Sequence, residues 1–195
     1  MTPTRSVTLA EAWWPTSDNT IFKTVVVAIL GSLLLTLSAK IKVPFVTVPM
    51  TMQLFVVLAL SLTLGARLSV AAVALYLVEG ASGLPVFAGT PEKGIGLAYM
   101  VGPTGGYLAG YLLAAASTGW LADKGFSRNI GLAFIAATIG AAAIYILGVF
   151  WLGSVLGWDK PILEYGFWPF IAADAVKVAL VALAVPAAWQ FSSRS

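Results

Sequence analysis

Six apolar segments constrain the fold of this chain more than any other feature of its sequence. They cover Ile21–Ala39, Thr51–Leu64, Ser69–Ala81, Gly105–Leu121, Ile130–Leu152 and Phe167–Ala188. A helix needs about 20 largely apolar residues to cross the hydrocarbon core of a bilayer, and the longest segments meet that requirement. Only 10% of the residues are charged, whereas soluble domains contain about 25%. The sequence therefore predicts an all-α integral membrane protein with six transmembrane helices.

The second and third segments are shorter than a usual span, and a tight turn at Gly65-Ala66-Arg67 joins them. We expect two tilted helices there, with irregular polypeptide completing the crossing on one side. The first residues are polar and lack the apolar region of a cleavable signal peptide. The predicted organisation is a polar N-terminal segment over 1–20, a single six-helix membrane domain over 21–190, and a tail over 191–195.

An even number of spans places both termini on the same side of the membrane. Of the eleven Lys and Arg residues, six fall on that side, four on the other, and one inside the last segment. Basic residues are more frequent in cytoplasmic loops, so this excess favours cytoplasmic termini. We predict a multi-pass protein of the cytoplasmic membrane with both ends inside.

Three irregular connections fall on the side opposite the termini, over residues 40–53, 82–106 and 157–166. The first contains Pro44 and Pro49, which prevent a regular helix. The second has seven glycines and three prolines in 25 residues. Both are too apolar for disordered linkers, and irregular backbone at membrane depth persists only when it is buried in protein or lines a cavity. They predict an ordered cap over a binding chamber that opens to one side.

The first segment carries small residues at a four-residue spacing, namely Thr24, Ala28, Ser32 and Thr36, with Gly31 beside them. Such a ridge lets two helix backbones approach closely. Two interpretations stay open at this point. The ridge could pack against another helix of this protein, or it could be the docking face for a second membrane protein.

The composition excludes several classes of function. The chain has no His and no Cys, which removes the usual general base and the usual metal ligands. Asp174 is the only Asp inside an apolar segment, so an intramembrane aspartyl protease is excluded. No phosphate-binding G-x-x-x-x-G-K-[ST] loop occurs. The net charge of +3 is scattered, which argues against a nucleic-acid partner. We predict a protein that is not an enzyme and that holds no metal or cofactor.

The last apolar segment carries Asp174 and Lys177 near its middle. Charges at that depth cost about 2.5–3.5 kcal/mol on insertion scales, so they normally face the interior of a bundle. On a helix, residues three apart point to nearly the same side, roughly 60° apart. The pair could lock neighbouring helices together. It could also hold a polar solute, because Asp accepts N–H donors and Lys donates to a carbonyl.

Other polar and aromatic residues lie on the chamber side of the segments. Glu79 ends the third segment beside the glycine-rich connection, and Gln53 begins the second. Thr104 lies in the turn Gly102–Tyr107, where free backbone N–H groups could meet an anionic or carbonyl group. Apolar walls of the kind found in small-molecule sites could come from Phe45, Phe87, Tyr99, Tyr107 and Trp168.

Four motifs together resemble a known family. They are Val43-Pro-Phe-Val-Thr-Val-Pro-Met-Thr-Met-Gln53, Gly83-Leu-Pro-Val-Phe-Ala88, Gly102-Pro-Thr-Gly-Gly-Tyr107 and Asp174-x-x-Lys177. In this order they resemble the BioY family, the biotin-specific substrate-binding (S) components of energy-coupling-factor transporters. The similarity extends from Ile21 to about Trp189.

The resemblance implies a six-helix S-component fold that captures biotin from outside. Asp174 and Lys177 would hold the ureido head, and the loop residues around Phe87, Gly89 and Tyr107 would cover the bicyclic ring and the valerate. The predicted substrate site comprises Asp174, Lys177, Tyr107, Phe87, Gly89, Thr104, Gln53 and Glu79.

The resemblance also implies partners, namely a transmembrane coupling (T) component and two ATPase subunits. The family's small-residue motif in helix one matches Ala28 and Ser32, although an alanine is usual where Ser32 stands. Predicted docking residues are Thr24, Ala28, Gly31 and Ser32. Two alternatives remain: a biotin transporter that works without partners, and a structural membrane subunit in which the Asp–Lys pair only locks helices.

Overall fold

Long helices form wherever the sequence is apolar, because a helix satisfies every backbone polar group internally in a medium without water. The computed structural model describes residues 8–13, 20–43 and 48–192. The long helices are α2 (Thr20–Lys40), α3 (Gln53–Ala81), α5 (Gly105–Asp123), α6 (Ile130–Leu156) and α8 (Trp168–Ser192). Short helical elements are α1 (Leu9–Trp13), α4 (Gly96–Met100), η1 (Phe126–Arg128) and α7 (Ile162–Gly166).

Helix α3 contains the second and third predicted segments and is broken between them. Gly65 has φ 78° and ψ 177°, so the helical path is interrupted there. Residues other than glycine rarely adopt that backbone conformation. A Cβ at Gly65 would also collide with the carboxylate of Asp123. The same carboxylate accepts a hydrogen bond from the Ala66 N–H at 3.2 Å, which caps the second half of α3. With this break, the prediction of six membrane helices is confirmed.

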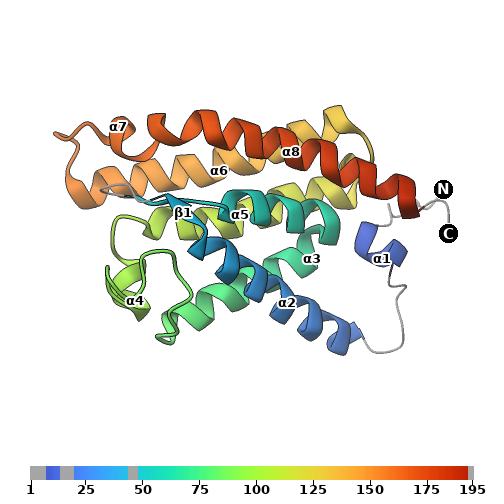
Figure 1. Ribbon diagram of the computed structural model, residues 1–195, viewed down its shortest axis with the longest axis horizontal. Helices are drawn as coiled ribbons and strands as arrows, with labels where there is room; N and C mark the ends of the chain where they lie inside the picture. Colours follow the sequence, from blue (N-terminus) through green and yellow to red (C-terminus); the bar gives the residue numbers. More distant parts are fainter. Residues whose placement is uncertain (1–7, 14–19, 44–47, 193–195) are drawn as a thin grey trace.

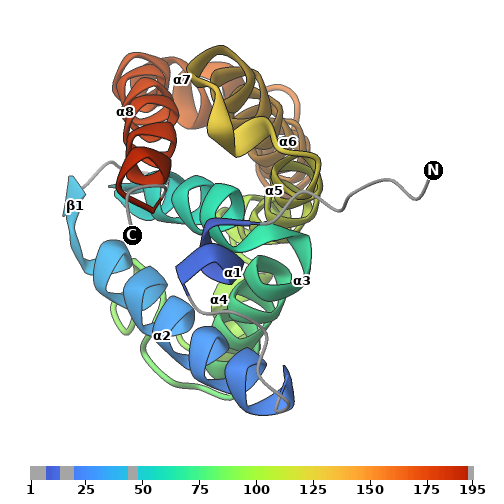
Figure 2. The same cartoon turned by 90° about the vertical axis from the view of Figure 1, so that its right-hand side faces the viewer.

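Helix α5 lies in the middle of the bundle, where it contacts both α3 and α6. Helix α8 packs against α6 and α3, and α2 packs against α3 on the opposite side (Figure 2). Two glycines allow α5 and α6 to approach each other closely. A Cβ at Gly110 of α5 would lie 2.7 Å from the Cα of Ile144 on α6, and one at Gly140 would strike the Thr118 side chain. Small residues thus set the spacing of α5 and α6.

The outer surface of the bundle is apolar. Four helical stretches are long and apolar enough to cross a membrane, namely Thr20–Lys40, Gln53–Ala81, Ile130–Leu156 and Ile162–Gln190. Large side chains such as Ile146 and Phe150 are more than 60% exposed on this surface. In water such a surface would be unfavourable, whereas in a bilayer it faces hydrocarbon. The chain is a multi-pass membrane protein.

The two ends of the bundle differ. The cap elements β1 (Lys42–Val43), α4 and α7 lie at one end, and α1 lies at the other, beside the last turns of α8 (Figure 1). Thr8 and Glu11 cap α1 reciprocally: the Glu11 N–H donates to the Thr8 hydroxyl at 3.4 Å, and the Thr8 N–H to the Glu11 carboxylate at 3.3 Å. Part of the predicted polar segment is therefore helical and joined to the bundle.

The predicted extended stretch after the first helix contains a short antiparallel ladder. Strand β1 pairs with β2 (Met50–Thr51), with Lys42 opposite Thr51 and Val43 opposite Met50. Phe45, a predicted wall residue, lies outside the described residues. In the second connection, α4 occupies part of a stretch that was expected to be irregular throughout. The described parts of both connections contain regular elements, as the cap prediction requires.

Candidate functional site

Two lysines hold the glycine-rich connection in place. The Lys40 ammonium donates to the carbonyl oxygens of Pro85 at 2.7 Å and Phe87 at 2.9 Å. The Lys42 ammonium donates to the carbonyl of Ala88 at 2.7 Å. Lys42 belongs to β1, so this bond ties the ladder to the connection. The two irregular segments therefore form one cap.

Aromatic rings build the interior of the cap. Phe87 is fully buried and stacks on Tyr99 with ring centroids 5.1 Å apart. It rests edge-on against Tyr76 at 5.4 Å and fills the space beside Gly80, where a Cβ would collide with its ring. The Gly89 N–H donates to the Tyr99 hydroxyl at 3.1 Å. These contacts fix the position of the cap backbone over the bundle.

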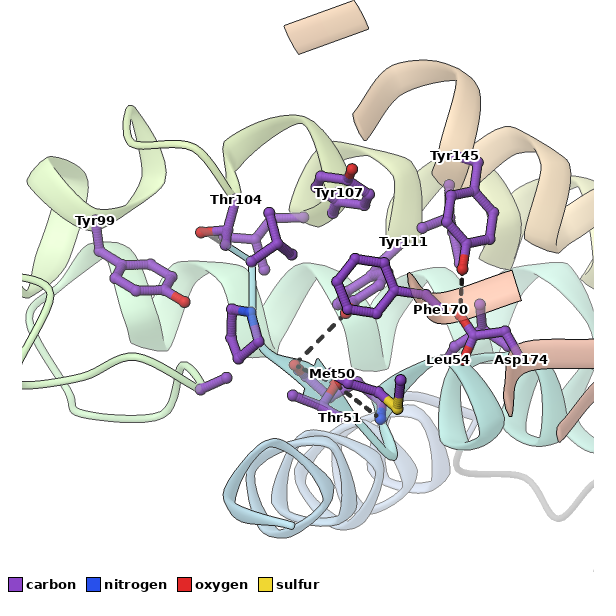
Figure 3. Close-up of a pocket in the computed structure, with 16 residues that line it drawn as sticks. Met50, Thr51, Leu54, Tyr99, Thr104, Tyr107, Tyr111, Tyr145, Phe170 and Asp174 are labelled. Carbon is purple, nitrogen blue, oxygen red and sulfur yellow. Dashed lines mark hydrogen bonds between the residues drawn. The ribbon is translucent and has the colours of Figure 1, made fainter. Parts of the chain in front are cut away.

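A chamber lies beneath the cap, with a cavity volume of about 60 Å³ (Figure 3). Its wall comes from the ladder region, α3, the cap, α5, α6 and α8. The lining residues are Val48, Pro49, Met50, Thr51, Gln53, Leu54, Ala88, Tyr99, Thr104, Tyr107, Leu108, Tyr111, Ile144, Tyr145, Phe170 and Asp174. Apolar and aromatic side chains dominate, with a few convergent polar groups. That combination is typical of a small-molecule site.

Asp174 and Lys177 meet on α8 beside this chamber. The Lys177 ammonium donates to the Asp174 carboxylate at 2.6 Å and to the Thr51 carbonyl at 2.7 Å. The Tyr145 hydroxyl on α6 donates to the other Asp174 oxygen at 2.5 Å. Both charged side chains are about 90% buried. One ion pair thus joins α8 to α6 and to the chain just before α3.

Gln53 organises a second polar group in the chamber. Its amide N–H donates to the Tyr76 hydroxyl at 2.7 Å, and its amide oxygen accepts from the Tyr111 hydroxyl at 3.5 Å. The Thr51 hydroxyl also donates to that oxygen, at 3.3 Å. The side-chain amide is thereby fixed, and its orientation is set by partners on α3 and α5.

Tyr107 connects the chamber to the third irregular connection. Its hydroxyl donates to the Gly166 carbonyl in α7 at 2.8 Å. Its ring lies against Gly148 of α6, where a Cβ would collide with it. The Trp151 indole N–H donates to the Gly102 carbonyl at 2.9 Å, which holds the start of α5. All three predicted cap connections are therefore bound to the bundle through aromatic side chains or lysines.

The predicted site residues separate into three groups. Asp174, Gln53, Thr104 and Tyr107 line the chamber, and Lys177 is bonded to two of its lining residues. Phe87 and Gly89 lie within the cap and help to shape it, but they do not line the chamber. Glu79 alone forms the third group, outside both the chamber and the cap, because it faces α2 and accepts a hydrogen bond from Ser32.

Among the lining residues that were not predicted, three are aromatic, namely Tyr111, Tyr145 and Phe170. Two of them had a signal in the helical period. Tyr111 lies four residues after Tyr107, and Phe170 lies four before Asp174, so each pair shares one face of its helix. Tyr145 had a weaker signal. Its hydroxyl lies inside a largely apolar segment, and a hydroxyl in a membrane needs a hydrogen-bond partner.

The small residues of α2 face the protein interior. Ala28, Gly31 and Ser32 are buried, and a Cβ at Gly31 would lie 2.6 Å from the Ala72 Cβ on α3. Thr24 is half-buried. The predicted docking residues therefore do not form an outer surface, since three of them are used to bring α2 and α3 together. For Ala28, Gly31 and Ser32, the structure agrees with the interpretation that the ridge packs against another helix of this protein.

Comparisons with known proteins agree on one family. The model of the BioY family matches residues 9–194. The biotin transporter BioY of Thermotoga maritima is 39% identical over 150 residues, which cover 77% of this chain and 86% of the relative. The biotin transporter BioY of Rhodobacter capsulatus is 37% identical, over 70% and 76% of the two chains.

A solved structure shows the same fold. The crystal structure of the S-component for biotin from an ECF-type ABC transporter superposes with a TM-score of 0.74 over 90% of this chain and 95% of that chain, at 22% identity. The predicted S-component fold is therefore confirmed. The relatives are transporters and not enzymes, which agrees with the prediction drawn from the missing catalytic residues. The chain belongs to the BioY family.

Proposed function

We propose that this protein binds biotin in the chamber beneath the cap and serves its uptake as the substrate-binding component of an energy-coupling-factor transporter. The observation that carries the proposal is the buried Asp174–Lys177 pair beside the chamber. The names of the relatives supply the ligand, and the polar groups of the chamber match its chemistry. No metal or cofactor enters the proposal, because biotin is the transported ligand.

The ureido head of biotin offers two N–H donors and one carbonyl oxygen. A carboxylate has about four acceptor positions, and Asp174 uses two of them for Lys177 and Tyr145. An ammonium has three donors, and Lys177 uses two of them, for Asp174 and the Thr51 carbonyl. The pair therefore has capacity to accept a ureido N–H and to donate to the ureido oxygen.

The aromatic walls suit the rest of the ligand. Tyr107, Tyr111 and Phe170 present ring surfaces to the chamber, against which an apolar bicyclic ring would pack. The cavity of about 60 Å³ holds only a few water molecules, since one water needs roughly 10–15 Å³ by the same measure. Biotin is larger, so we propose that the two segments of the cap move apart when it binds. The Lys40 and Lys42 bonds are the contacts that such a movement would break or stretch.

The proposal also assigns an orientation and partners. The cap faces the outside of the cell, and both termini face the cytoplasm, in agreement with the excess of basic residues on that side. A T component and two ATPases would drive uptake. Thr24 remains a proposed contact, but Ala28, Gly31 and Ser32 are buried. A partner would therefore meet α2 through the exposed neighbours Val25 and Ile29.

Calorimetric titration of biotin into the purified protein tests the binding. We expect binding by the wild type and a loss of about 2–5 kcal/mol of affinity in Asp174→Asn, the range for truncating one partner of a buried charged pair. Asp159→Asn is a matched control, because Asp159 is 72% exposed in a surface pair. Equal affinity of wild type and Asp174→Asn would remove Asp174 from the site.

A helix lock is the second candidate function, since all described polar groups of the pair already have partners inside the protein. It predicts that Asp174→Asn lowers stability while the wild type does not bind biotin.

Partner dependence is a separate question. Uptake of labelled biotin by vesicles that contain this protein alone, without ATP, would support a self-sufficient transporter.

A further inference from the structure

A second hollow lies between α6 and α8 and opens on the outer surface of the bundle. Its volume is about 410 Å³, and exposed side chains such as Phe134, Ile146 and Ile171 form its rim. Tyr145 and Asp174 border both this groove and the chamber. The hydrogen-bonded pair of Tyr145 and Asp174 thus lies between the two hollows.

The groove offers no unpaired polar side chain among the described residues that line it. The Thr138 hydroxyl donates to the Phe134 carbonyl at 2.8 Å. The Tyr145 hydroxyl donates to Asp174, whose other oxygen accepts from Lys177. A polar solute would lose its hydration in this groove and would find spare acceptor capacity only at the buried Asp174 carboxylate, which is unfavourable. The lining therefore favours a pure hydrocarbon.

Two alanines create the space. Ala142 on α6 and Ala175 on α8 are exposed and line the groove, so that neither helix fills it. An apolar cavity of roughly 150 Å³ is enough to bind a benzene ring, and this groove is larger. It lies on helices that are long and apolar enough to cross a bilayer. The hydrocarbon available at that place is the acyl chain of a phospholipid.

We propose that an acyl chain of a bilayer phospholipid occupies the groove between α6 and α8 and supports Tyr145 from the lipid side. On that side the Tyr145 ring already meets Phe167, with ring centroids 5.1 Å apart. An unfilled groove would leave the rest of that face of the ring without contacts, and missing contacts forfeit dispersion energy. Because the Tyr145 hydroxyl orients Asp174, the chain would also stabilise the chamber. This consequence rests on the proposed biotin-binding function; the occupancy itself does not.

Native mass spectrometry of the protein released from lipid nanodiscs tests the occupancy. We expect the wild type to retain one phospholipid and Ala175→Leu to lose it, because the added side chain fills the groove. Ala172→Leu is the matched control, since Ala172 is exposed on the same helix but does not line the groove. Ala142→Leu fills the groove from α6 and serves if Ala175→Leu does not fold. Equal retention in the groove-filling variants and the control overturns the proposal.

Biotin titration before and after lipid removal tests the coupling to the chamber. Delipidation of the wild type should lower biotin affinity on the order of tenfold, about the effect of one charge-assisted hydrogen bond. Added phospholipid should restore it, and Ala175→Leu should respond to neither treatment. A wild-type affinity that is unchanged by delipidation overturns the coupling. Absence of biotin binding in every lipid state overturns the proposed function instead, and the phospholipid count then decides the groove alone.

Discussion

Two Asp–Lys pairs in the described part of the structure lie in opposite surroundings. Asp159 and Lys160 lie in the connection between α6 and α7, 3.1 Å apart, with 72% and 55% of their side chains exposed. Asp174 and Lys177 lie within α8, 2.6 Å apart, with 11% and 9% exposed. The residue types are the same, and the pairing distances differ little. The two pairs differ chiefly in access to water.

That difference separates a surface contact from the pair that we propose to bind biotin. A surface pair contributes about 0–1 kcal/mol, because water screens it. A buried pair must repay the desolvation of two charges, and apolar residues in its place are often neutral or stabilising. The inner pair is also held by Tyr145 and by the Thr51 carbonyl, whereas the outer one lies on the surface. A costly arrangement with supporting partners points to a task beyond stability.

The largest expected contrast is in thermal stability. Lys177→Met leaves the Asp174 carboxylate without its cation and should destabilise the protein by about 3–5 kcal/mol, the usual effect of breaking a buried pair from one side. Lys160→Met should stay within about 0.5 kcal/mol, as exposed substitutions do. Thermal unfolding of both variants in the same detergent measures the contrast. Equal melting temperatures would mean that the inner pair is hydrated.

The next contrast concerns the partner of the inner pair. Tyr145→Phe removes one hydroxyl from Asp174 and keeps the ring, so we expect a loss of about 1.5–3 kcal/mol in biotin affinity, the range for hydrogen bonds to charged groups. Tyr165→Phe is the control, because Tyr165 is 39% exposed on α7. Titration of both variants with biotin gives the comparison. If Tyr145→Phe bound biotin like the control, Tyr145 would have no role in orienting Asp174.

The sequence predicted the helices and the inner pair because both depend on local patterns. Apolar length and the glycine turn at Gly65 gave six spans, and α2, α5 and α6 begin within one residue of the predicted starts. Asp174 and Lys177 stood out because charges inside a span are expensive. Gln53, Thr104 and Tyr107 were placed by the connections next to them, and the structure brings all three to the chamber.

The remaining site residues depend on contacts between distant segments. Glu79 ends a segment beside the cap, yet the direction of its helix face turns it toward Ser32 on α2. Phe87 belongs to the cap, but stacking on Tyr99 directs it into the cap interior. Tyr145 is 29 residues from Asp174 along the chain, so only the packing of α6 on α8 pairs them. The rotation of a helix about its own axis decides the direction of Glu79 and of Tyr145, and the apolar pattern of the six helices does not fix that rotation.

A smaller effect is expected at the cap. Lys42→Met removes the bond to the Ala88 carbonyl between the ladder and the glycine-rich connection, and Lys42 is exposed, so water replaces part of the lost bond. We expect biotin to dissociate about fivefold faster, equivalent to roughly 1 kcal/mol, with little change in melting temperature. Stopped-flow displacement of a labelled biotin measures the rate. Lys160→Met is the control, because the Lys160 ammonium pairs with the exposed Asp159 and not with the Ala88 carbonyl. An equal rate in both variants would contradict a role for Lys42 in closing the cap.

The smallest expected effect is that of salt on the coupling energy within each of the two Asp–Lys pairs. Exposed charges are screened once the Debye length falls to about 3 Å, near 1 M salt, whereas buried pairs are screened much less. Double-mutant cycles on unfolding should therefore give the outer pair a coupling of less than about 1 kcal/mol that disappears in high salt. The inner pair should keep its coupling, because only about a tenth of each side chain reaches solvent. A coupling at Asp174 and Lys177 that fades with salt as the outer one does would show that ions enter the chamber, and the distinction between the two pairs would then be one of degree.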